Sequence, residues 1–402
     1  MKVSIIIPMY LCESYVDSLF SSLLSQDYTD FEIICVVDGS PDNTLALVQE
    51  CSKKDERVSV INVEHRGAGV ARNIGMDNAR GDYLMFLDAD DDYQSDFIGK
   101  MVRAMEESDA DIGVCQYASY NQWDGLYSKN AGFSEAMLPK DRDIIVPMSL
   151  KDPMFWFSSV AHNKIFRKSF VENCGLRFSS TMSINDIFFV NATILSAENV
   201  VLIRERLYTY RTNHNIHSIT SNRDLFRSDV FTVFDELYSW IIDNGFAEHC
   251  TAPFCKRWGG LFRSYARYGV SAEFQDMAVR YLTEKEPWKS MDDKMLYRVS
   301  GLDTSVAVIK KRIAEMRLKR LKKNTESPSC ANEQALAIER AEREIRQSES
   351  ELANISAIRH RLCSEYHRNV DRHDNIIRAG IWRIEDFGFG QSLSLLLKKL
   401  KA

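Results

Sequence analysis

Apolar runs and segments of helical periodicity alternate along the first part of the chain. The apolar runs have the length and unbroken hydrophobicity of buried strands, and they cover residues 3–7, 31–37, 58–63, 83–87 and 111–117. Apolar residues recur at helical intervals in the segments between them, at 16–24, 44–51, 69–79 and 97–105. This order predicts an α/β fold with a mostly parallel sheet that helices cover on both faces.

The predicted strand at 83–87 leads directly into an acidic cluster at residues 88–92, with the sequence Asp-Ala-Asp-Asp-Asp. Because ligands of open α/β sheets bind beyond the carboxyl ends of the strands, these acids are expected to face a binding crevice. A divalent cation would relieve their mutual repulsion and share its open positions with a phosphate. An EF-hand loop is excluded, because Tyr93 and Gly99 occupy the positions where that loop needs Gly and Glu. The remaining alternative is a solvated turn whose aspartate caps the next helix.

Length and composition limit the classes of protein that fit. A chain of 402 residues is long enough for two domains, and its net charge of −6 makes it a poor candidate for nucleic-acid binding. Its 9 cysteines are scattered and form no C-x-x-C pair, as expected of reduced thiols. No apolar run approaches the roughly 20 residues of a membrane helix. We therefore expect a cytoplasmic protein, with peripheral attachment to the inner face of the plasma membrane as the alternative.

Four motifs follow one another at the ends of the predicted elements. They are Ile7-Pro8-x-Tyr10, the segment 37–44 (VDGSPDNT), the segment 69–75 (GVARNIG) and Leu87-Asp88-x-Asp90-Asp91. In this order they resemble the family 2 glycosyltransferases of the GT-A fold. The resemblance continues through the segments 163–167, 176–178, 183–189, 208–211 and 217–220. It covers about residues 1 to 220 and implies a Rossmann-like, mostly parallel sheet covered by helices.

The resemblance implies a nucleotide-sugar site at the strand ends. Asp38 would accept hydrogen bonds from a uracil-like base that Pro8 and Tyr10 frame. Arg72 would contact the base or the diphosphate, or else form a structural ion pair. Val37 departs from the pattern, because most relatives carry another aspartate in its place. The residues implied for the donor site are Pro8, Tyr10, Asp38, Arg72, Asp88 and Ala89.

The resemblance also implies a metal ion and a general base. Asp90 is the expected ligand of Mn²⁺ or Mg²⁺ beneath the diphosphate, with Asp88 beside it toward the ribose, and His217 is a second candidate contact for the metal or the phosphate. Asp186 is the expected base for the acceptor hydroxyl, and its alternative role is to cap the helix that follows. Asn185 stands where relatives mostly carry glutamate, which removes a charge that would raise the pKa of Asp186.

The motifs end near residue 222, and the remaining pattern is helical. A basic segment at 306–323 followed by an acidic one at 333–351 predicts an antiparallel hairpin. Apolar residues seven apart from Ile338 to Leu352 add a coiled-coil periodicity, so the alternatives are an intramolecular hairpin and a surface for self-association or docking. The leucine- and lysine-rich tail would either pack on the hairpin or lie on anionic lipid. The predicted domains are a catalytic domain at 1–221, a helical domain at 222–300, and the charged hairpin with its tail at 301–402.

The resemblance, together with these features, implies an inverting, metal-dependent glycosyltransferase of bacterial surface-polysaccharide assembly. It would move a sugar from a nucleoside diphosphate sugar, expected to be a UDP-sugar, to a glycan or lipid-linked acceptor. The alternative is an inactive scaffold of the same fold that binds partners through its C-terminal helices. Against that alternative, the chain has all of the acids expected in an active site, which are Asp38, Asp88, Asp90 and Asp186. A nucleotidyltransferase is disfavoured because residues 8–13 offer no basic side chain for a triphosphate.

Overall fold

The computed structural model divides the chain into two compact units, Met1–Phe254 and Cys255–Ala402. The first unit holds the sheet, and the second is described only at a few helical positions. The residues that the structure describes are 2–122, 125–130, 132–133, 144–147, 157–212, 228–248, 250–251, 254, 277, 281, 311, 339–340 and 342–350.

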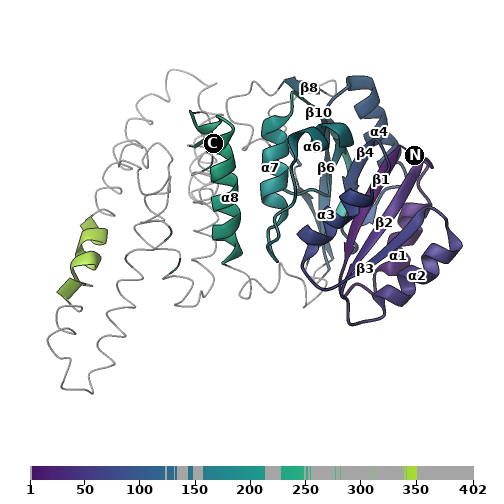
Figure 1. Cartoon of the computed structure of the whole chain (residues 1–402), viewed down its shortest axis with the longest axis horizontal. Helices are drawn as coiled ribbons and strands as arrows, with labels where there is room; N and C mark the ends of the chain where they lie inside the picture. The colour runs from purple at the N-terminus through teal and green to yellow at the C-terminus, as the bar shows by residue number, and fades with distance from the viewer. Residues whose placement is uncertain are drawn as a thin grey trace, which may run out of the picture. The chain divides into compact units, whose positions relative to one another are not determined.

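Each strand and helix predicted between residues 3 and 117 is present, with ends that differ by a few residues (Figure 1). The strands are β1 (Val3–Met9), β2 (Phe31–Asp38), β3 (Val58–Val63), β4 (Tyr83–Phe86), β5 (Asp92–Tyr93), β6 (Ile112–Asn121), β7 (Leu126–Asn130), β8 (Ile144–Pro147), β9 (Lys164–Arg167) and β10 (Asn199–Thr212). The helices are α1 (Val16–Leu24), α2 (Thr44–Lys54), α3 (Ala68–Asn78), α4 (Phe97–Ser108), α6 (Lys168–Cys174), α7 (Asp186–Ser196) and α8 (Asp229–Asp243).

The strands form one mixed sheet. Its main path runs β3-β2-β1-β4-β9-β6-β10-β5, with β7 beside β6 and β8 beside β10. The path from β3 to β4 is parallel throughout, as predicted. Beyond β4 the sheet is mixed, because the short strand β9 lies antiparallel between β4 and β6. The carboxyl ends of β1, β2 and β4 therefore lie side by side, where ligands of α/β sheets bind.

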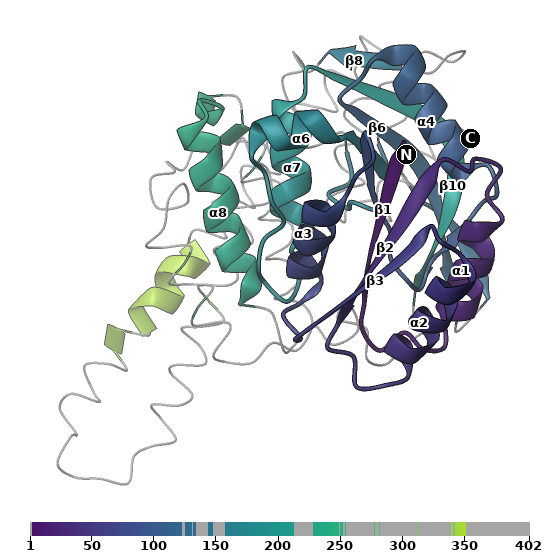
Figure 2. The same ribbon diagram turned by 45° about the vertical axis from the view of Figure 1, so that its right-hand side comes forward.

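Helices cover both faces of the sheet, which explains the unbroken apolar runs of the central strands (Figures 1 and 2). On one face, Ile5 and Ile7 of β1 belong to a core that includes buried residues of α1, α2 and α4. On the other face, Ile6 and Phe86 belong to a core that includes residues of α3, α6 and α7. The alternation along β1 thus assigns successive side chains to opposite layers.

One acid is buried within this apolar sheet. Glu32 of β2 accepts hydrogen bonds from Ser4 Oγ (2.7 Å), from the Arg80 backbone N–H (2.8 Å) and from the Arg80 guanidinium (2.9 and 2.7 Å). Burial alone would raise the pKa of Glu32, but these hydrogen bonds and the charge of Arg80 bring it below its ordinary value. The buried carboxylate is therefore stabilised in its charged form.

We expect Glu32→Gln to lower the free energy of unfolding by about 2 kcal/mol at pH 7, because hydrogen bonds to a charged acceptor are lost. A pKa that is lowered in the folded state stabilises the protein above the unfolded-state pKa, about 4.3, and this contribution is lost as the pH falls through the folded-state value. Urea unfolding at neutral pH and at about pH 3 measures the difference under both conditions. A deficit that does not shrink at the lower pH would contradict this origin.

In the second unit, described residues of the basic and acidic segments are in contact. Residues 342–350 are helical with Ser348 buried, and Lys311 Nζ lies 2.8 Å from Glu349 Oε1. This ion pair agrees with the predicted hairpin, whereas most heptad positions and the whole tail lie outside the described residues. The domain limits, the coiled coil and the self-association surface stay predictions. Within the described part of the chain, no helix has the length and hydrophobicity needed to span a membrane.

Candidate active site

A pocket of about 290 Å³ opens at the carboxyl ends of β1, β2 and β4. This volume is close to the lower end of the roughly 300–1,000 Å³ range of small-molecule sites. Side chains from distant parts of the sequence meet there. The predicted site residues on its wall are Pro8, Tyr10, Asp38, Arg72, Asp88, Ala89, Asp90 and Asp186. His217, the remaining candidate, lies outside the described residues.

One corner of the pocket is built around Asp38 at the end of β2. Its carboxylate accepts hydrogen bonds from the backbone N–H groups of Arg66 and Gly67, each at 2.8 Å, and His65 Nδ1 lies 2.9 Å from its Oδ2. The His65 ring stacks on Tyr10, with centroids 4.1 Å apart. The sequence suggests only a hydrogen-bond donor in a loop for His65, whereas the structure places it beside the predicted nucleobase site.

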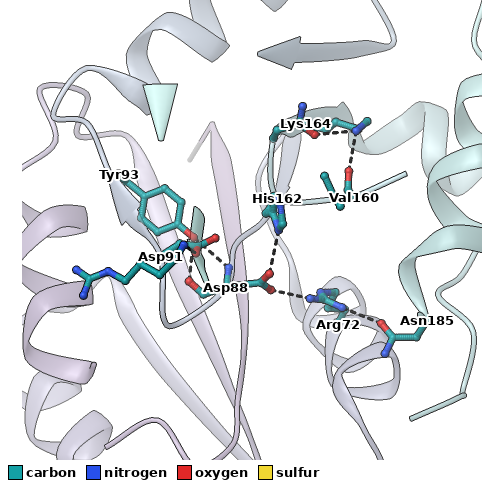
Figure 3. A network of polar contacts seen from close by, with 10 residues as sticks. Arg72, Asp88, Asp91, Tyr93, Val160, His162, Lys164 and Asn185 are labelled. Carbon is teal, nitrogen blue, oxygen red and sulfur yellow. Dashed lines mark hydrogen bonds and ion pairs between the residues drawn. The ribbon is translucent and has the colours of Figure 1, made fainter. Parts of the chain in front are cut away.

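A chain of polar contacts runs from the pocket wall into the interior (Figure 3). Asp88 Oδ1 accepts a hydrogen bond from Arg72 Nη2 at 2.7 Å, and Asp88 Oδ2 lies 2.9 Å from His162 Nδ1. Arg72 also donates through Nη1 to Asn185 Oδ1 at 2.8 Å. Burial would raise the pKa of Asp88, but Arg72 and His162 hold it well below its usual range. Arg72 therefore forms an ion pair with Asp88, and its contact with the base or the diphosphate of a donor stays a prediction.

Asp91 is a buried acid that the motifs did not single out for a role. Its Oδ1 accepts a hydrogen bond from the Arg211 backbone N–H at 3.0 Å, whereas Oδ2 has no hydrogen-bond partner among the described residues. Burial raises the pKa of Asp91, and the charges of Asp90 and Asp88 raise it further. An additional positive charge near Oδ2 would therefore stabilise the ionised form.

Asp88, Asp91 and His162 form a group that could share a metal ion, because one ligand atom from each lies within 4.8 Å of the others. His162 Nε2 is buried and, like Asp91 Oδ2, has no hydrogen-bond partner in the described part of the chain. Carboxylates suit Mg²⁺ and Mn²⁺, and an imidazole nitrogen favours the transition metal. Asp90 adds a carboxylate on the adjoining pocket wall. The donor set thus fits a divalent cation at this edge of the sheet.

Asp186 is the first residue of α7, and Asn185 holds the N-cap position. The N-cap residue Asn185 makes no side-chain capping hydrogen bond, and Asp186 lies within the first turn of the helix. Burial raises the pKa of Asp186, while Arg72 and His162 oppose the rise. A carboxylate with a raised pKa is a stronger proton acceptor, as a general base requires.

A parallel half-sheet that ends in clustered acids, with a separate carboxylate on the same pocket, agrees with the GT-A fold expected from the sequence. Residues 4–174 match the family model described as Glycosyl transferase family 2. This part of the chain is therefore similar to the members of that family.

Curated bacterial relatives carry glycosyltransferase names. Glycosyltransferase GlyA of Streptococcus pneumoniae is 29% identical over 214 residues, which is 52% of this chain and 30% of GlyA. The uncharacterized glycosyltransferase EpsJ of Bacillus subtilis is 30% identical over 215 residues, which is 53% of this chain and 62% of EpsJ. The chain thus spans less than two thirds of the length of these relatives.

Among solved structures, the chain is similar to Staphylococcus aureus TarS. TarS 1–349 in complex with UDP has a TM-score of 0.55 and 19% identity, over 86% of this chain and 92% of that chain. The complex with UDP-GlcNAc has a TM-score of 0.54 and 17% identity, over 88% and 92% of the two chains. At this identity the similarity shows a shared fold.

Proposed function

We propose that this chain is an inverting glycosyltransferase that moves a sugar from a UDP-sugar to a hydroxyl group of a glycan or lipid-linked acceptor. The observation that carries the proposal is that Asp88 and Asp90, at the end of β4, line one pocket with Asp186 at the start of α7. Sugar transfer requires charge stabilisation at the departing diphosphate and a proton acceptor at the attacking alcohol. The pocket has acidic groups for both tasks.

The corner around Asp38 supports a uridine nucleotide. The Asp38 carboxylate has lone pairs beyond those used by its two backbone N–H donors, and it can accept the ring N–H of uracil. Tyr10 is 41% exposed and offers a ring face for base stacking. Pro8 and Ala89 line the same pocket. The structures of TarS with UDP and UDP-GlcNAc add support from a protein of the same fold.

The acids after β4 support a divalent cation, Mn²⁺ or Mg²⁺, with Asp90 as the ligand nearest the donor and His217 as a further contact. Such an ion supplies Lewis-acid stabilisation of the leaving diphosphate. The unpartnered Oδ2 of Asp91, among the residues described, and the grouping of Asp91 with Asp88 and His162 support a cation at this edge. Arg72 keeps Asp88 charged and fixed in orientation beside Asp90.

Asp186 takes the proton of the acceptor hydroxyl while that oxygen attacks the anomeric carbon of the donor. The new C–O bond forms as the bond from the anomeric carbon to the diphosphate oxygen breaks, and UDP leaves with the electron pair. When attack and departure occur on opposite faces of the sugar, an α-linked donor gives a β-linked product. Asp186 is therefore assigned to the acceptor side of the pocket, and the acids after β4 to the donor side.

We infer the kind of acceptor and the cellular site from the proposed class of enzyme. Sugar nucleotides are cytoplasmic, so we place transfer in the cytoplasm, or at the inner face of the plasma membrane when the acceptor is lipid-linked. The bacterial relatives support glycosyl transfer by the names that they carry, and we propose that this transfer serves surface-glycan assembly. The C-terminal helices are the part of the chain assigned to self-association or membrane contact.

A screen of donor hydrolysis across UDP-, GDP- and dTDP-sugars, with Mn²⁺, Mg²⁺ or EDTA, tests the proposal. We expect UDP-sugars to be hydrolysed, EDTA to abolish turnover, and Asp90→Ala to lower it by about 100-fold or more, because metal stabilisation of the leaving group is lost. Asp82→Ala is the matched control, since Asp82 is an exposed acid just before β4 with a side chain 69% exposed. Unchanged turnover in EDTA would contradict the metal. UDP binding without turnover of any UDP-sugar would favour the inactive scaffold.

A further inference from the structure

The segment that carries Asp186 is fixed on one side to α3. Arg72 Nη1 donates to Asn185 Oδ1 at 2.8 Å. Gly69 packs so closely on the segment that a Cβ there would lie 2.1 Å from the carbonyl oxygen of Ser179. A side chain at position 69 would therefore displace the backbone that leads to Asp186, the proposed general base. Helix α3 is the first of two anchors of this segment.

The second anchor comes from α8, which lies beside α7 (Figures 1 and 2). Asp229 Oδ2 accepts hydrogen bonds from the Ser183 backbone N–H at 2.8 Å and from the Ser183 hydroxyl at 3.2 Å. Thr181 Oγ1 donates to the Ser183 carbonyl oxygen at 2.9 Å. Ser183 is thus bonded on its backbone N–H, its backbone carbonyl and its side chain. Helix α8 lies beyond residues 4–174, which the family model matches.

Between the two anchors the backbone is strained. Ile184 has a φ of 48°, in the left-handed region that β-branched residues rarely adopt. Such a conformation persists only where the surrounding structure fixes it. The neighbours of Ile184 are Ser183 and Asn185, which are the residues bonded to Asp229 and Arg72. The anchors therefore hold the turn from which Asp186 enters the pocket.

We propose that Asp229 is a positioning residue for the reaction. By holding Ser183, it maintains the strained turn at Ile184 and so keeps the Asp186 carboxylate directed into the pocket. This inference rests on the proposed role of Asp186 as general base. It makes the first turn of α8 part of the apparatus that aligns the base, although no motif of the family extends to it.

A simpler role for Asp229 would be confined to its own helix. It lies in the first turn of α8, where a negative charge interacts favourably with the helix dipole. Asp229→Asn removes the charge but keeps a side-chain oxygen that can accept from Ser183. Asp229→Ala removes both the charge and the oxygen. Comparison of the two variants therefore separates the effect of the hydrogen bonds to Ser183 from the effect of the charge on the helix dipole.

We expect Asp229→Ala to lower kcat by about 10-fold or more at unchanged KM for the donor, because small displacements of a catalytic group reduce rate strongly. Asp229→Asn should stay within about 3-fold of the wild type, since the hydrogen bond is kept. Asp243→Asn, at the exposed end of the same helix, is the matched control. The donor is the UDP-sugar hydrolysed fastest in the screen above, and UDP is the binding probe.

Hydrogen exchange at the Ser183 amide gives a readout that does not depend on turnover. The amide should exchange about 10-fold faster in Asp229→Ala than in the wild type, because its acceptor is lost, and at the wild-type rate in Asp229→Asn and Asp243→Asn. UDP affinity should be the same in all variants. Should Asp229→Ala fail to fold, Ser183→Ala removes the hydroxyl bond to Asp229, keeps the backbone N–H bond, and should lower kcat by about 2-fold to 3-fold at unchanged KM.

The outcomes distinguish this inference from the proposed function. Wild-type kcat in Asp229→Ala, or in Ser183→Ala where it replaces that variant, would overturn the anchor and leave Asp186 as base. An equal loss of kcat in Asp229→Asn and Asp229→Ala would show that Asp229 acts through its charge at the helix dipole and not by holding Ser183. If Asp229 acts through Asp186, the double variant Asp229→Ala/Asp186→Asn should have nearly the same kcat as Asp186→Asn alone. A loss of kcat in the double variant equal to the two single losses combined would overturn the inference. A wild-type rate of sugar transfer in Asp186→Asn would instead exclude Asp186 as the general base.

Discussion

Asp186→Asn is expected to lower kcat by about 10²–10⁴-fold, because an amide cannot take the proton of the acceptor hydroxyl. Affinity for UDP should be unchanged, since asparagine has nearly the same size and Arg72 bonds to Asn185 rather than to position 186. Rates of sugar transfer and calorimetric titration with UDP measure the two quantities. Transfer near the wild-type rate would exclude Asp186 as the base.

The same residue gives the wild type a defined pH dependence. Burial raises the pKa of Asp186 above the ordinary value for aspartate, and Arg72 and His162 oppose that rise. The base is active when deprotonated, so kcat should increase as the pH rises through this raised pKa. A kcat profile from about pH 4 to pH 8 tests the assignment. If the decrease of kcat at low pH persists unchanged in Asp186→Asn, it reflects the protonation of another group.

Arg72→Met is expected to lower the free energy of unfolding by about 3 kcal/mol, because it leaves the Asp88 carboxylate without its cationic partner in a largely buried site. The side chains of Arg72 and Asp88 are 10% and 25% exposed, and the ion pair is 2.7 Å long. Urea unfolding in EDTA measures the effect without interference from a bound cation. Arg72→Met should also weaken UDP-sugar turnover, since Asp88 loses its fixed orientation.

An exposed ion pair on the same part of the molecule provides the control. Arg177 and Asp77 lie 2.6 Å apart with side chains 52% and 57% exposed, so Arg177→Met should cost less than about 1 kcal/mol. The double variant Arg72→Met/Asp88→Asn should recover most of the lost stability, because it removes the uncompensated charge. Equal losses for Arg72→Met and Arg177→Met would show that burial adds nothing to the Arg72–Asp88 pair.

The parallel half of the fold and the acidic cluster at its edge could be predicted from local patterns. Strands buried on both faces appear as unbroken apolar runs, and the acids that follow them mark the strand ends. Because β2 and β4 flank β1 in the structure, Asp38 and Asp90 line the same pocket, as the resemblance implied. The placement of Asp186 on the same pocket depended on the family resemblance, since its local pattern fits a helix start equally well.

The contacts that local patterns could not reveal join residues far apart in the sequence. His162 is 74 positions from Asp88, and Asp229 is 46 positions from Ser183. Periodicity reports which face of an element is apolar, but it does not report which distant polar groups meet. Strand β9 was missed for another reason: it is short, and it begins with a lysine, a residue that is rarely buried. Lys164 is nevertheless fully buried, and its ammonium group donates to the carbonyl oxygens of Ser158 and Val160.

The position of β9 sets an order for the assembly of the nascent chain. It is the strand that joins β4 to β6, and it is synthesised after both. Until Arg167 has left the ribosome, β4 and β6 each lack β9, the neighbour that they share. At that stage the parallel strands from β3 to β4 are the only continuous part of the main sheet path. Two unpaired strand edges exposed during synthesis are a site for aggregation or chaperone binding. The centre of the finished sheet therefore closes only after the strands on both sides of it have been made, and β10, which is synthesised later still, then joins β6 to β5.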